Sequence, residues 1–181
     1  FLSLGKQESR PLAPLNLAEV VERALTLVRP KARHLGVELQ WSAPADPLTI
    51  AGDADRLAQV AVNLLLNAVE AAAEAGTAQA AQRTAPRVVL RLTSAASTGG
   101  VRLEVLDTGT GPAEHVRDQL YEPLVSEKPD GVGLGLSIAQ EIIEQHGGTL
   151  AWRRGDNLTS FIVELAKCNA EDAHAETVDR G

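Results

Sequence analysis

Apolar residues change their spacing several times along this chain, and these changes most constrain its fold. From Asn16 onward they recur at the spacing of a helix, and the Asn16 side chain is suited to capping one. A second helical pattern follows Asp53, another good N-cap, and continues to about Ala75. A third covers residues 136–145, with Gly147 placed to end it. The sequence therefore predicts three helices.

Between the helical patterns, apolar and polar residues alternate as they do in half-buried strands. The alternating segments are residues 37–41, 88–92, 101–105, 150–152 and 161–165. Gly99 and Gly100 separate two of them and predict a hairpin, and the last two suggest another. Because hairpins join antiparallel strands, the pattern favours an α+β fold, a two-layer α/β sandwich, over a doubly wound parallel sheet.

The composition limits the core, the compartment and the partners. The 181 residues suffice for one domain, but only 3% are aromatic and none is Met, so the core must consist of Ala, Leu, Val and Ile. The formal net charge of −7 argues against a nucleic-acid partner, because phosphate backbones need a basic face. Cys168 is the only cysteine, which excludes an internal disulfide and favours a cytoplasmic domain. No apolar stretch is long enough to span a bilayer.

Two asparagines in the second predicted helix are the first candidates for chemistry. Asn63 and Asn67 lie one turn apart in an otherwise apolar segment. Asparagine is a poor helix former, and a buried amide needs hydrogen-bond partners. The pair is therefore either a surface stripe of amides or two neutral oxygens that face a metal or a polar ligand. Magnesium prefers such hard oxygen ligands.

A carboxylate and two glycines follow the strand at 101–105. Asp107 lies at the strand end, and Gly109 and Gly111 allow a ligand to approach the backbone closely. A carboxylate at this rim can accept a hydrogen bond from an exocyclic amine such as that of adenine. Taken alone, the same residues are also ordinary turn chemistry.

A third glycine-rich segment opens the last predicted helix. Gly131, Gly133 and Gly135 precede it, and glycines at a helix start expose backbone amides to an anion. The segment lacks the Gly-Lys-Ser/Thr ending of a Walker loop. It also does not follow a buried strand, as a dinucleotide fingerprint would.

The order of these motifs resembles that of sensor histidine kinases. The chain carries N-x-x-x-N-A, D-x-G-x-G, Y-E-P-x-x-x-x-K and G-x-G-x-G-L, similar to the asparagine box, first glycine box, phenylalanine box and second glycine box of that family. The family belongs to the GHKL, or Bergerat-fold, superfamily with gyrase, Hsp90 and MutL. The segments NLLLNAVEA and YEPLVSEKPDGVGLGLS are similar to the nitrogen-regulation and dicarboxylate-sensor branch. The resemblance covers residues 12–165 and implies a mixed sheet covered on one face by three helices.

The resemblance implies ATP and Mg²⁺ as ligands and gives each motif residue a role. Asn67 would ligate the metal, and Asn63 would contact phosphate or a metal-bound water. Asp107 would accept from the adenine amine, and Lys128 would reach the phosphates from a lid at residues 112–130. Asn63 and Lys128 are the expected catalytic residues. The other expected nucleotide contacts are Gly109, Gly111, Gly131, Gly133, Leu134, Gly135, Leu136 and Thr159.

The phenylalanine box departs from the family pattern. Tyr121 stands at its first position, and Leu124 and Val125 stand where related kinases often carry aromatic residues. Glu127 places a negative charge beside Lys128, which opposes phosphate binding by the lid. These differences concern the lid more than adenine binding.

The resemblance also implies a missing half. The family's phosphoacceptor histidine is usually followed by an acidic residue, and His34, His115, His146 and His174 are not. We expect residues 1–10 to be the end of an upstream dimerisation helix that carries the acceptor, 11–166 to be the catalytic ATP-binding domain, and 167–181 to be a disordered tail.

The implied partners are that upstream domain and the receiver domain of a response regulator. The resemblance also implies a homodimeric parent that can be anchored in the inner membrane. The alternatives are a GHKL-type ATPase or serine kinase, or a degenerate nucleotide-binding docking module. In the gyrase-like branch a glutamate that activates water lies one turn before the metal-binding asparagine. Here that position is Asn63, which weakens the ATPase alternative.

Overall fold

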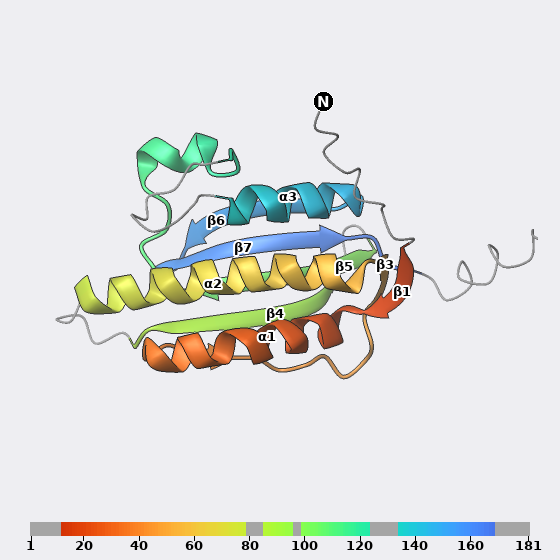
Figure 1. The fold of residues 1–181 in the computed structure, drawn as a ribbon, viewed down its shortest axis with the longest axis horizontal. Helices are drawn as coiled ribbons and strands as arrows, with labels where there is room; N and C mark the ends of the chain where they lie inside the picture. The colour runs from red at the N-terminus through yellow and green to blue at the C-terminus, as the bar shows by residue number, and fades with distance from the viewer. Residues whose placement is uncertain (1–11, 79–84, 96–98, 124–133, 169–181) are drawn as a thin grey trace, which may run out of the picture.

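In the part of the chain that the structure describes, a mixed five-stranded sheet carries the three α-helices on one face (Figure 1). The computed structural model describes residues 12–78, 85–95, 99–123 and 134–168. The strand order is β2-β4-β5-β7-β6, and β2 pairs in parallel with β4 while the other neighbours are antiparallel. The strands are β2 (Glu38–Gln40), β4 (Arg87–Ala95), β5 (Gly100–Asp107), β6 (Thr149–Gly155) and β7 (Leu158–Leu165). The predicted two-layer sandwich is confirmed.

The helices begin where the sequence predicts. They are α1 (Leu17–His34), α2 (Ala54–Ala78) and α3 (Gly135–Gln145), and α2 lies between the other two (Figure 1). The Asn16 side chain accepts from the amide of Ala18 at 3.2 Å, and the Asp53 carboxylate accepts from the amide of Asp55 at 2.9 Å. Both predicted caps are therefore formed. Within the described ranges, no helix combines the length and apolar character that crossing a membrane requires.

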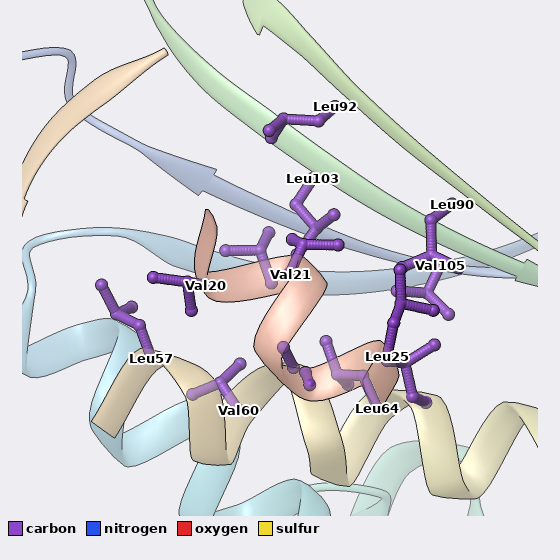
Figure 2. Packing of buried hydrophobic residues seen from close by; sticks show 14 of the residues in the cluster. Val20, Val21, Leu25, Leu57, Val60, Leu64, Leu90, Leu92, Leu103 and Val105 are labelled. Atoms are coloured by element: carbon purple, nitrogen blue, oxygen red, sulfur yellow. The ribbon is translucent and has the colours of Figure 1, made fainter. Parts of the chain in front are cut away.

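Aliphatic side chains fill the space between the two layers. Figure 2 shows residues from α1 and α2 meeting residues from β4 and β5. The labelled members of this core are Val20, Val21, Leu25, Leu57, Val60, Leu64, Leu90, Leu92, Leu103 and Val105. Burying one such side chain contributes about 1.5–3 kcal/mol, so a core that is almost free of aromatic rings can still hold the sandwich together.

A second, two-stranded sheet was not predicted from the sequence. It pairs β1 (Ala13–Asn16) with β3 (Thr49–Gly52) in antiparallel orientation. Each strand has only four residues, too few to show alternation, and Pro14 lies inside the first, which is tolerated at a sheet edge. This small sheet ties the start of α1 to the start of α2, because β1 runs into α1 and β3 ends just before the cap of α2.

The face of the large sheet away from the helices holds a buried charge network. Glu104 is only 7% exposed and accepts from Ser160 and Arg153, each at 2.6 Å, with Arg91 at 4.0 Å. Burial by itself would raise the pKa of Glu104. The hydrogen bonds from Ser160 and Arg153, with the charges of Arg153 and Arg91, outweigh burial and hold the pKa below its ordinary value of 4.5.

Glu104→Gln should lower the free energy of unfolding at pH 7 by about 1–2 kcal/mol, because it removes a carboxylate that two donors stabilise. The folded pKa is depressed, so the wild-type advantage is complete above 4.5 and should shrink as pH falls through the folded value. Urea unfolding at neutral pH and at about pH 3 measures both quantities. The exposed Glu38→Gln is the control; an equal effect of both variants would contradict the network's role.

Candidate functional site

Helix α2 touches both glycine-rich segments with one line of side chains. The Asn63 amide donates to the carbonyl of Gly135 at 3.1 Å. Eight residues later, Ala71 lies so close to Gly109 that a Cβ on that glycine would be 2.7 Å from the Ala71 Cβ. Asn67 is midway between them on the same side of the helix. At 1.5 Å per residue, Asn63 and Ala71 are about 12 Å apart along α2.

The rim of the sheet brings four of the predicted residues together. Asp107 ends β5 with 1% exposure, and its Oδ1 accepts from the amide of Gly109 at 2.7 Å. Thr159 is its cross-strand neighbour on β7 and is 2% exposed. Gly111 has a φ of +78°, and a Cβ there would lie 3.1 Å from the Thr159 hydroxyl. Glycine is therefore required at 109 by space and is favoured at 111 by conformation.

Sequence reasoning missed Arg154, which also belongs to this rim. Its Nη1 donates to the carbonyl of Gly109 at 2.8 Å and to the Thr159 hydroxyl at 2.9 Å. Arg154 is on β6 directly opposite Thr159. A signal was present, because Leu150, Trp152 and Arg154 occupy every second position of one strand. An arginine that continues an apolar row needs polar partners on that side of the sheet.

The start of α3 lies beside Asn63, at the opposite end of the line of side chains on α2 from the contact between Ala71 and Gly109. Leu134 is the N-cap of this helix, and Gly135 is its first residue. The first amides of a helix have no acceptor within it, so the backbone of Gly135 and Leu136 is suited to binding an anion. Three predicted contacts, Lys128, Gly131 and Gly133, lie outside the described residues, and their roles stay predictions.

Tyr121, at the start of the altered phenylalanine box, is partly buried beside α3. Its hydroxyl is buried with no hydrogen-bond partner among the described residues, and burial raises its pKa to about 12. It borders a hollow of about 430 Å³ beside α3, next to Leu134, Ile138 and Glu141. The other altered positions of the box, Leu124, Val125 and Glu127, are outside the described residues.

His146 is a structural residue at the end of α3. Its Nε2 accepts from the amide of Asp53 at 3.0 Å, and its Nδ1 lies 2.7 Å from the carbonyl of Ile142. A backbone amide can only donate, so Nε2 carries no proton and Nδ1 donates to the carbonyl. The Nε2 bond thus joins the end of α3 to the cap of α2, while the Nδ1 bond to Ile142 stays within α3 and fixes the ring, in agreement with the prediction of an element-end histidine.

The comparisons with known sequences agree with the predicted resemblance. Residues 52–168 match the family described as "Histidine kinase-, DNA gyrase B-, and HSP90-like ATPase". The chain is 38% identical over 154 residues to the C4-dicarboxylate transport sensor protein DctB of Rhizobium meliloti, covering 85% of this chain and 23% of that protein. It is 36% identical over 170 residues to the sensory histidine kinase/phosphatase NtrB of Rhodobacter capsulatus, covering 89% and 45%. The chain therefore spans less than half the length of these relatives.

Solved structures have the same fold. The nucleotide-free catalytic domain of histidine kinase ThkA superimposes with a TM-score of 0.73 at 27% identity, covering 87% of this chain and 97% of that one. ThkA in its complex with the response regulator protein TrrA gives a TM-score of 0.68 at 25% identity, covering 87% and 42%. Both likenesses extend over most of this chain.

Gly109→Ala should destabilise the protein by about 1–3 kcal/mol, the usual cost of overpacking. The new Cβ would lie 2.6 Å from Asp107 Oδ1 and 2.7 Å from the Ala71 Cβ, so the loop or α2 must shift. Thermal unfolding measures the loss. Gly155→Ala is the matched control, because a Cβ there meets nothing within 4 Å. Equal melting temperatures for the two variants would show that the approach of Gly109 to α2 is not tight.

Proposed function

Because the chain belongs to the histidine kinase-, DNA gyrase B- and HSP90-like ATPase family, we propose that it is the ATP-binding catalytic domain of a two-component sensor histidine kinase. In this role it would donate the γ-phosphoryl group of ATP to a histidine on an upstream dimerisation domain. One observation carries the proposal: α2 connects the buried Asp107 loop to the start of α3 and places Asn67 between them. One helix would thus join a base-binding end to a phosphate-binding end.

Asp107 is suited to recognising adenine. A carboxylate accepts hydrogen bonds, and the 6-amino group of adenine donates one, whereas guanine presents a carbonyl at the same place. The bond from the Gly109 amide fixes the orientation of the Asp107 carboxylate before a ligand arrives. Gly109 and Gly111 would line the base, because the lack of a Cβ lets it approach the backbone closely.

The phosphate end fits a magnesium nucleotide better than a metal bound by protein alone. The described residues contain no group of three or more His, Cys, Asp or Glu side chains placed to hold a metal. Asn67 offers one amide oxygen, and Mg²⁺ typically takes one or two protein oxygens with phosphates and water completing its shell. Bound Mg²⁺ would neutralise phosphate charge. Asn63 would orient the phosphates beside the amides of α3, assisted by Lys128 from the lid.

The full-length parent would supply the remaining parts. The ThkA–TrrA complex supports a response regulator as the protein that finally receives the phosphoryl group. An upstream dimerisation domain bearing the acceptor, a homodimeric parent and an inner-membrane anchor are further parts of the proposal. Hydrolysis of ATP is disfavoured, because the Asn63 amide cannot take a proton from water as a glutamate can.

Asp107→Asn should weaken ATP binding by about ten- to a hundredfold, because an amide can turn its donor toward the adenine amine and a bond to a charged group is lost. Calorimetric titration of the folded variant measures the change. Asp55→Asn is the matched control, since Asp55 is exposed on α2 and pairs with Arg23 at 2.9 Å. Wild-type affinity in Asp107→Asn would remove Asp107 from the base site.

The chain alone should bind Mg-ATP without becoming labelled by ATP that carries a radioactive γ-phosphate. A separately supplied dimerisation domain with an acceptor histidine should restore transfer and become labelled itself. Acid-labile phosphate distinguishes phosphohistidine from phosphoserine. Such phosphate on the isolated chain would show that the acceptor is not upstream, and binding without transfer to any supplied domain would favour a docking module.

A further inference from the structure

Three hydrogen bonds link four residues at the sheet rim across three neighbouring strands. Asp107 on β5 accepts from the amide of Gly109, and the carbonyl of Gly109 accepts from Arg154 on β6. Arg154 also donates to Thr159 on β7, which is the cross-strand neighbour of Asp107. The peptide groups of Gly109 are thus fixed at both ends, by a carboxylate on one side and a guanidinium on the other.

Arg154 also orients the Thr159 hydroxyl. A hydroxyl has one hydrogen and two lone pairs, and here one lone pair accepts from Arg154. The hydrogen of that hydroxyl must therefore point away from Arg154. Thr159 is buried and lies beside Asp107, so its hydroxyl orientation affects the same space that the base would enter.

Strand β6 contacts the segment that follows Asp107 at a second residue, Arg117, in addition to Gly109. Arg117 of the 3-10 helix Glu114–Gln119 stacks over the ring of Trp152, with its guanidinium 5.8 Å from the ring centre. Trp152 and Arg154 project from the same side of β6. The two contacts therefore fasten residues 109–117 to the sheet edge, and Arg154 fastens the end nearest Asp107.

Arg154 belongs to the base end of the site. Its partner Gly109 packs on Ala71, whereas the start of α3 contacts Asn63, about 12 Å farther along α2. Its effect on a nucleotide should therefore not depend on the number of phosphates.

We propose that Arg154 is the positioning residue for base recognition, acting through Gly109 and Thr159 to hold the Asp107 loop in its binding conformation. The inference rests on the proposed function, since it assumes that Asp107 receives the base. Arginine suits the task because one planar nitrogen can donate to two acceptors held at fixed angles. Lysine is a flexible point charge and would not fix both at once.

Arg154→Ala and Arg154→Lys test the proposal, and Arg153→Ala is the matched control. Arg153 is the next residue on the same strand, but it faces the other side of the sheet and bonds to Glu104. The affinities for ATP, ADP and AMP are measured by displacement of a fluorescent ATP analogue, and melting temperatures are recorded for each variant. Arg154→Ala should weaken all three nucleotides by the same factor, about tenfold. Arg154→Lys should fall between it and wild type, and Arg153→Ala should bind as wild type does.

Two results would overturn the proposal. One is equal affinity in Arg154→Ala and Arg153→Ala. The other is a loss that grows from AMP to ATP, which would mean that Arg154 contacts phosphates. If the melting temperature of Arg154→Ala is well below that of wild type, the test uses Arg154→Lys instead, provided that it melts at the wild-type temperature. Its affinities for ATP, ADP and AMP are then compared with those of Arg153→Ala. Failure of the proposed function looks different, because wild type would then not bind adenine nucleotides or Asp107→Asn would bind as well as wild type.

Discussion

The close approach of Gly109 to α2 determines how the rest of the site can be arranged. A Cβ at this position would overlap both the Asp107 carboxylate and Ala71, so only glycine lets the rim of the sheet meet the helix. With that contact made, the spacing along α2 places Asn67 and Asn63 at successive turns toward α3. The distance between the two ends of the site therefore follows from helix geometry and needs no flexible loop to set it.

The helices and strands whose packing brings Gly109 against α2 are also the features that the sequence predicted best. Periodicity predicted the three helices, both hairpins and the layer arrangement, because each depends on apolar residues that repeat within one element. The caps at Asn16 and Asp53 were predictable for the same local reason, since their partners lie within three residues. The sheet of β1 and β3 was not, because its four-residue strands have no internal pattern and pair across more than thirty residues of chain.

The residues of the candidate site also fall into two groups, those that local sequence motifs indicate and those that only the fold brings together. Asp107, its glycines and the asparagines could be proposed from the sequence because they occur in motifs of fixed local spacing. Arg154 and the bond between His146 and Asp53 depend on partners that only the fold brings together. The alternation of Leu150, Trp152 and Arg154 indicates that this arginine continues an apolar row, but a single sequence gives no pairing register and so does not name its partners. The ligand-binding roles of all these residues stay predictions, and Lys128, Gly131 and Gly133 also lie outside the described residues.

The strand register shows that side chains change from apolar to polar between two neighbouring cross-strand rows of the sheet, and the candidate site lies at the polar row. On the side that faces the helices, the row Leu90, Val105, Phe161 and Trp152 is apolar across four strands. The next row toward the rim is Val88, Asp107, Thr159 and Arg154, in which three strands change to polar residues together. Polar groups in a row that would otherwise be core are costly unless they satisfy one another. The bonds through Gly109 provide this satisfaction, so a carboxylate with 1% exposure can be stable at the rim of the sheet.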